Sequence, residues 1–296
     1  MFAAMSEFIY QLFLQPFAEF AFMRRALIAC IALGLSGSAI GVFLVLRRMT
    51  LIGDSISHAI MPGASLAFML VGFSLIPMTI GGLLAGVIIA SLAALVAKLT
   101  NLHEDASFTG THLLCLSASI MMISVNGSNI DLMHILFGNI LAVDWQTLLL
   151  VGVIASINLL LISWFYRLLV LECADPIFLR SLGNNSAIPQ QLFMFALVLN
   201  LVAGFHALGT LMALGLLILP AIASFFWGRT IDAMIIISFV IAIFSSYCGL
   251  LLSYHANLPS GPAIVFIAGI IYVISLLFGA NESVRSRYLQ RQHLTG

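Results

Sequence analysis

The chain has 296 residues, of which 62% are hydrophobic and only 7% are charged, and its formal net charge is zero. A soluble domain carries about 25% charged residues, so a chain this apolar would expose too much hydrophobic surface in water. The balanced charge leaves no basic patch for nucleic acid. The composition therefore predicts an all-α fold, a polytopic bundle of transmembrane helices.

The N-terminal segment, residues 1–24, is expected to precede the bundle. Within it, residues 8–22 mix aromatic side chains with Gln11, Gln15 and Glu19. This mixture is typical of an amphipathic helix that lies at a membrane interface. The segment carries acidic residues and no basic n-region, so we do not interpret it as a signal peptide.

Nine apolar segments follow, close to the length of about 20 residues that a helix needs to cross a bilayer. They cover residues 25–46, 51–71, 76–97, 108–125, 143–166, 188–206, 208–227, 231–253 and 263–278. The sixth and seventh segments are nearly continuous, so eight spans is the alternative. We expect one transmembrane domain over residues 25–279 and a cytoplasmic C-terminal tail over residues 280–296.

The distribution of basic residues predicts the orientation, because cytoplasmic loops are enriched in Lys and Arg. With the C-terminal end of the first span in the cytoplasm, most of the eleven basic residues lie inside. These are Arg47, Arg48, Lys98, Arg167, Arg180, Arg229, Arg285, Arg287 and Arg291. Arg24 and Arg25 fall outside and conflict with this orientation.

The second span contains two ionisable residues, Asp54 and His58. Ionisable groups inside a spanning helix are costly and are candidates for a functional site. Their four-residue spacing places both on one helical face, and His58 lies about 12 Å into the span at a rise of 1.5 Å per residue. A carboxylate with an imidazole suits Zn²⁺ or Mn²⁺ and offers no soft sulfur for Cu⁺. The alternative is a buried ion pair that only stabilises helix packing.

Five further histidines are weaker candidates for contact with a metal. They are His103, His112, His134, His206 and His255. For each of them alone, an ordinary interfacial or hydrogen-bonded role is the stronger interpretation. His112, early in the fourth span, is expected to form a hydrogen bond within the bundle.

The stretch around Asp54 and His58 carries a family resemblance. Residues 46–63 read LRRMTLIGDSISHAIMPG, which resembles the signature of the zinc, manganese and iron uptake permeases of ATP-binding cassette (ABC) importers. Matches continue in order through EDAS (104–107), DLMHILFGNILA (131–142), DP (175–176), GTLM (209–212), LILPA (217–221), SY (253–254) and PSG (259–261). In that family the residues matching Asp54 and His58 coordinate metal in the translocation path.

The resemblance also implies partners and a cargo. Residues 172–183, with Asp175, Pro176, Arg180 and Gly183, would form the coupling segment that docks on the ATPase. The implied assembly is a second permease copy or close relative, two ATP-binding subunits and a periplasmic or extracellular metal-binding protein, in the bacterial inner membrane. The expected cargo is Zn²⁺, with Mn²⁺ or Fe²⁺ as alternatives, and no permanently bound cofactor is expected.

Two other classes of protein are alternatives to the importer. A secondary transporter or channel is the main alternative, although no clear internal repeat is visible in the sequence. An enzyme is disfavoured because the zinc protease motif is missing. The chain has no P-loop either: Lys98 is its only lysine and follows Ala97. A separate ATPase is therefore expected to supply the energy.

Overall fold

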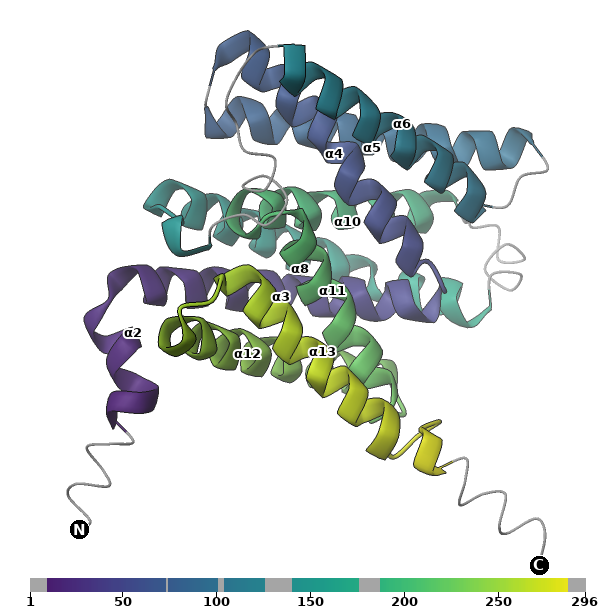
Figure 1. The fold of residues 1–296 in the computed structure, drawn as a ribbon. Helices are drawn as coiled ribbons and strands as arrows, with labels where there is room; N and C mark the ends of the chain where they lie inside the picture. The colour runs from purple at the N-terminus through teal and green to yellow at the C-terminus, as the bar shows by residue number, and fades with distance from the viewer. Residues whose placement is uncertain (1–9, 73, 101–103, 126–139, 176–186, 287–296) are drawn as a thin grey trace, which may run out of the picture.

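In a computed structural model, residues 10–72, 74–100, 104–125, 140–175 and 187–286 are described. All regular structure in these ranges is helical (Figure 1). The elements are η1 (Tyr10–Leu14), α2 (Gln15–Glu19), α3 (Ala21–Leu46), α4 (Thr50–Val71), α5 (Leu75–Leu99), α6 (Glu104–Val125), η2 (Ile140–Ala142), α8 (Trp145–Ala174), α10 (Ala187–Leu208), α11 (Thr210–Phe225), α12 (Ile231–Ala256) and α13 (Ser260–Phe278). The predicted all-α class is confirmed.

Each of the nine predicted segments corresponds to one long helix. Seven of these helices are long and apolar enough to cross a membrane, and the apolar parts of α6 and α11 are shorter. The sixth and seventh segments are separate helices. Gly209 divides them with φ 81°, a left-handed conformation that glycine adopts without a steric penalty. The sixth and seventh segments therefore form two helices rather than one.

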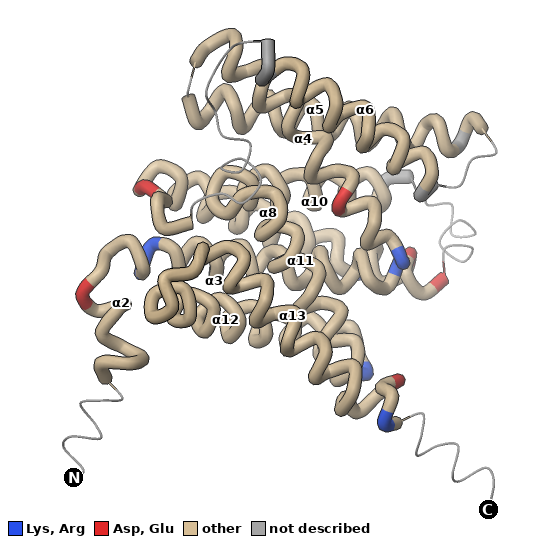
Figure 2. The backbone as a smooth tube through the Cα atoms, in the orientation of Figure 1, with Lys and Arg blue, Asp and Glu red and all other residues tan. Residues whose placement is uncertain are grey.

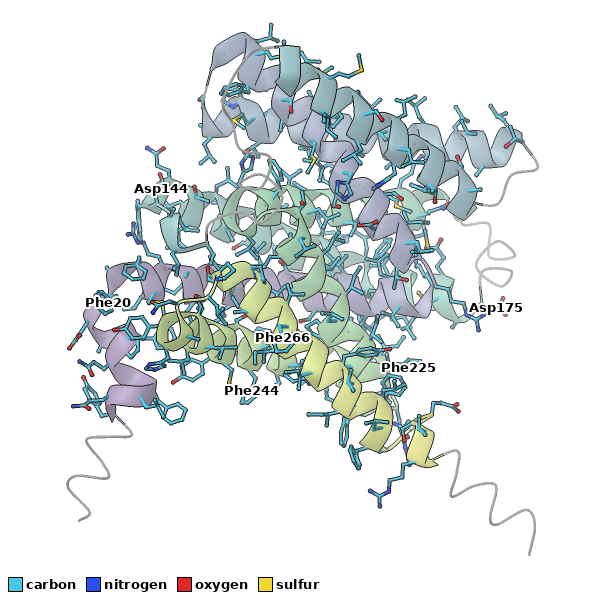
Figure 3. The ribbon with its side chains drawn as sticks, in the orientation of Figure 1. Phe20, Asp144, Asp175, Phe225, Phe244 and Phe266 are labelled. Atoms are coloured by element: carbon cyan, nitrogen blue, oxygen red, sulfur yellow. The ribbon has the colours of Figure 1, made fainter. Side chains whose placement is uncertain are left out.

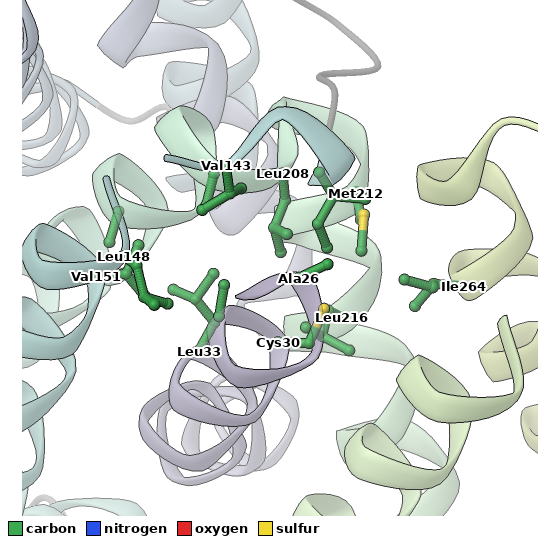
Figure 4. Packing of buried hydrophobic residues seen from close by; sticks show 14 of the residues in the cluster. Ala26, Cys30, Leu33, Val143, Leu148, Val151, Leu208, Met212, Leu216 and Ile264 are labelled. Atoms are coloured by element: carbon green, nitrogen blue, oxygen red, sulfur yellow. The ribbon is translucent and has the colours of Figure 1, made fainter. Parts of the chain in front are cut away.

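The helices are arranged with α3 at the centre of the larger part of the bundle. Figure 1 shows α4, α5 and α6 grouped together along α10, with α3, α8, α11, α12 and α13 on the other side of α10. Buried side chains of α3 pack against neighbouring helices. Ala26 and Leu33 lie between Val151 of α8 and Leu216 of α11 (Figure 4). This contiguous core stabilises the larger part of the bundle. The α4–α6 group packs beside it, along α10.

Charged residues of both signs lie at the two ends of the bundle (Figure 2). Phe20 and Asp144 mark one end, and Asp175 and Phe225 mark the other (Figure 3). Several described arginines lie at the Asp175 end: Arg47 pairs with Glu172, Arg48 follows it, and Arg229 comes just after α11. The predicted cytoplasmic end is therefore the Asp175 end.

The opposite end carries Arg24 and Arg25, the two residues that conflicted with the orientation. Asp144 caps α8 there and accepts a 2.8 Å hydrogen bond from the Thr147 amide. Hydrogen bonds from Thr147, first from its side chain and then from its amide, hold the pKa of the Asp144 carboxyl below its usual range, and the positive charge of Arg25 contributes in the same direction. A neighbouring carboxylate thus offsets the charge of Arg25.

The N-terminal segment is helical from Tyr10 to Glu19 and lies against the end of α12. The Phe17 ring stacks on Tyr247 at 5.1 Å between centroids, and the Tyr247 hydroxyl donates to the Phe13 carbonyl at 2.8 Å. His255 Nε2 lies 3.0 Å from the Leu12 carbonyl. The helix α3 starts at Ala21, a turn earlier than the predicted boundary at residue 25. The interfacial location of the segment stays a prediction.

Helices α4 and α5 approach closely where two glycines meet. A Cβ atom added at Gly63 would lie 2.1 Å from the Gly81 carbonyl oxygen and 2.4 Å from Ala85 Cβ. Membrane helices use such small residues to bring their backbones into contact. The contact sets how α4, the helix that carries Asp54 and His58, lies against α5.

We predict that Gly63→Ala lowers the thermal stability of the detergent-purified protein. Overpacking of a tight contact costs about 1–3 kcal/mol, and here the added methyl group would meet backbone. The control is Gly152→Ala, because an added Cβ at Gly152 has nothing within 4 Å. Equal melting temperatures for the two variants would contradict the close α4–α5 contact.

Candidate metal centre

Asp54 and His58 lie one turn apart on α4, as their spacing predicts. His58 Nε2 is 3.8 Å from Asp54 Oδ1. This separation is too long for a hydrogen bond but is suitable for two atoms that share one ion. The structure thus brings together the two residues that the sequence selected.

A third side chain, His112 of α6, completes the group. Its ring centroid lies 4.6 Å from that of His58, with the rings nearly perpendicular at 89°. One potential ligand atom from each of Asp54, His58 and His112 lies within 4.8 Å of the other two. Because α6 packs along α4 (Figure 1), the site spans two helices.

The surroundings of the group favour a ligand role. The Nδ1 atoms of His58 and His112 are buried and have no hydrogen-bond partner among the described residues. A buried polar atom without a partner costs free energy unless something else occupies its lone pair. The Asp54 side chain is 54% exposed, whereas that of His58 is 17% exposed. The group is therefore open at Asp54 and closed at His58.

Two imidazoles and one carboxylate form a mixed nitrogen and oxygen donor set. Such a set suits divalent Mn, Fe and Zn. All three residues lie on helices rather than loops, which holds their relative positions. The chemistry of the donors fits a metal ion that enters from the open Asp54 side.

His112 was only a weaker candidate in the sequence, but the structure places it beside His58 and Asp54. Its expected hydrogen bond within the bundle is not formed at Nδ1. The signal in the sequence was an ionisable residue in an apolar segment, but the pairing of α4 with α6 could not be read from it. His206 and His255 lie outside the group, and His103 and His134 lie outside the described residues.

Of the four predicted coupling residues, only Asp175 lies within the described residues. Asp175 is exposed at the C-terminal end of α8, where its amide donates a 2.9 Å hydrogen bond to the Leu171 carbonyl. Pro176, Arg180 and Gly183 lie outside the described residues.

The model of the ABC 3 transport family matches residues 19–279. The chain belongs to this family. It is 34% identical over 284 residues to the manganese import system permease protein ScaB of Streptococcus gordonii, covering 95% of this chain and 99% of that protein. It is 29% identical over 279 residues to the chelated iron transport system membrane protein YfeD of Yersinia pestis, covering 94% and 92%.

A solved structure agrees with this assignment. The chain is similar to one in PsaBC from Streptococcus pneumoniae in complex with Fab, with a TM-score of 0.83 and 30% identity. The similarity covers 97% of this chain and 99% of that chain. The family resemblance drawn from the sequence is confirmed, and the bundle is that of an ABC transporter permease, an integral membrane protein.

We predict that His112→Ala weakens binding of Mn²⁺ and Zn²⁺ to the purified permease. Loss of a group that only supports a ligand typically costs about 10–100-fold in affinity, so loss of a ligand should cost at least as much. Competition with a fluorescent chelator measures the affinity. His255→Ala, at the end of α12, is the matched control and should leave the affinity unchanged. An unaltered affinity in His112→Ala would remove His112 from the site.

Proposed function

We propose that this chain is the membrane permease through which an ATP-driven importer moves a divalent first-row transition metal, with Mn²⁺ as the first candidate. The observation that carries the proposal is the cluster of Asp54, His58 and His112 between α4 and α6. Membership of the ABC 3 transport family supports the ATP-driven class. Family membership also disfavours the alternative that the chain is a secondary transporter or channel.

The proposed metal is Mn²⁺, in place of the Zn²⁺ that the sequence predicted. The relatives named above are manganese and chelated iron proteins, and none of these names supports zinc. A carboxylate with imidazoles accommodates Mn²⁺ and Fe²⁺. Zinc remains the second candidate because the additional imidazole of His112 makes the donor set richer in nitrogen.

The proposed chemistry follows from desolvation. A divalent ion that leaves water needs compensating charge and lone pairs. Asp54 supplies the charge, and the neutral rings of His58 and His112 supply directional lone pairs. The open side at Asp54 leaves room for water or for a group from a second permease. A transported ion must also leave the site, and ligands that exchange readily allow its release.

The proposed assembly places this chain beside a second permease copy or close relative. Two ATP-binding subunits dock at the Asp175 end, and a metal-binding protein delivers the ion at the Phe20 end. The likeness to PsaBC supports the permease arrangement. The bacterial inner membrane is the proposed location.

We predict that Asp54→Ala and His58→Ala each abolish metal uptake while the protein stays in the membrane. Uptake of Mn²⁺, with Fe²⁺ and Zn²⁺ as competitors, is measured in cells that lack the chromosomal gene and carry each variant. The carboxylate control is Asp144→Ala, because Asp144 caps α8 away from the site. Preferential uptake of Zn²⁺ over Mn²⁺ by the unchanged protein would reverse the proposed order of metals.

The double variant separates a metal site from a structural pair. Breaking a buried ion pair by removing one partner costs about 3–5 kcal/mol, whereas removing both partners is better tolerated. A structural pair therefore predicts that Asp54→Ala/His58→Ala restores stability and uptake. A metal site predicts that the double variant is as inactive as either single variant, and normal transport by the double variant would refute it.

We predict that Asp175→Lys or Arg180→Glu weakens binding of the ATPase without affecting membrane insertion. Asp175 is the exposed C-cap residue of α8, and reversal of an interface charge changes a favourable contact into a repulsive one. Co-purification with the tagged ATPase measures docking, and membrane fractionation measures insertion. Full co-purification together with full uptake would contradict the coupling role.

A further inference from the structure

The turn between α3 and α4 contains an arginine that is largely buried. Arg47 follows the last residue of α3, and α4 begins at Thr50. The turn is tight: Arg48 adopts φ 58°, and the Met49 amide donates to the Leu44 carbonyl at 2.9 Å. Asp54 follows in the second turn of α4. A displacement of Arg47 therefore moves the start of the helix that carries the metal ligands.

Arg47 is bonded to the end of α8. Its Nη2 atom lies 2.7 Å from Glu172 Oε2, and its Nε donates to Cys173 Sγ at 3.3 Å. The Arg47 and Glu172 side chains are only 9% and 12% exposed, so water screens this ion pair little. At a rise of about 1.5 Å per residue, the 30 residues of α8 span about 45 Å, longer than a hydrocarbon core of about 30 Å. Helix α8 is therefore longer than the hydrocarbon core requires.

Arg47 also contacts the start of α10. Its guanidinium carbon lies 4.6 Å from the centre of the Phe193 ring, a cation–π contact. Phe193 is 2% exposed and packs edge-on against Phe43 of α3 at 6.5 Å. One guanidinium thus contacts the helix before residues 176–186, the helix after them, and the turn that leads into α4.

We propose that Arg47 is a positioning residue that couples the two helices flanking residues 176–186 to α4, and so couples movement of the ATPase to the metal site. The inference rests on the proposed function, in which this segment docks on the ATPase. Arginine suits the role because its planar guanidinium can bond a carboxylate and face an aromatic ring at once. The contacts join Glu172 and Phe193 to Arg47, and the short turn after Arg47 leads directly into the helix that carries Asp54.

The test uses the complete transporter, with its ATPase subunits and metal-binding protein, in proteoliposomes. Transport of Mn²⁺ and of Zn²⁺ and hydrolysis of ATP are measured together. We expect Arg47→Gln to lower the ions moved per ATP hydrolysed by about fivefold or more, the lower range of typical coupling between sites. ATPase co-purification should be retained, because residues 176–186 are unchanged.

A second variant separates coupling from stability. Arg47→Gln alone leaves the largely buried carboxylate of Glu172 without its partner, which destabilises the fold. Arg47→Gln/Glu172→Gln removes both charges and should restore the melting temperature. We expect its ratio of transport to hydrolysis to stay low, because the links to α8 and α10 are still weakened. Arg47→Lys keeps the charge but loses the planar fork and should be intermediate.

The control is Arg167→Gln, which removes an exposed charge from α8 and should leave the ratio unchanged. A normal ratio in the double variant would overturn the role of Arg47. Loss of ATPase co-purification in that variant would also overturn it, because Arg47 would then serve docking. An unaltered complex that moves neither metal would overturn the proposed function, and the coupling role with it.

Discussion

A polar atom inside a membrane has no water to bond, and leaving it without a partner costs several kcal/mol. Most serine hydroxyls in this bundle meet the constraint within their own helix, by donating to a carbonyl about one turn earlier, as Ser36 and Ser246 do. Between helices, Asn200 donates to the Ser36 hydroxyl at 2.6 Å. The Nδ1 atoms of His58 and His112 are among the buried polar atoms that lack a partner in the described residues, as are His206 Nε2 and the Asn158 amide. Unlike the others, those of His58 and His112 belong to a group with Asp54 that could hold a metal ion.

Helix α4 takes part in the glycine contact with α5, in the candidate metal site and in the turn at Arg47. Gly63 brings it against α5, His58 faces His112 of α6, and its first turn follows the turn that contains Arg47. These contacts hold α4 at several points along its length.

The sequence predicted more of the fold than of the site. Hydropathy located all nine helices, because each of them must satisfy its backbone internally in lipid and so appears as a continuous apolar run. The four-residue spacing paired Asp54 with His58 because helical geometry is local. His112 was undervalued, since nothing in its own segment indicates which helix it faces. The zinc preference was not supported, because the choice of metal depends on a complete ligand set.

The sequence by itself determined the membrane class, the order of the helices, the family and the first two candidate ligands. The membrane class, the helices and the two candidate ligands follow from composition and from periodicities of a few residues, and the family follows from the resemblance of the motifs. The tertiary structure alone decided that α6 places His112 beside His58, and that Arg47 contacts Glu172 and Phe193 on both sides of the predicted coupling segment. The rotation and crossing of each helix depend on side-chain packing between segments far apart in the chain, which no local pattern encodes.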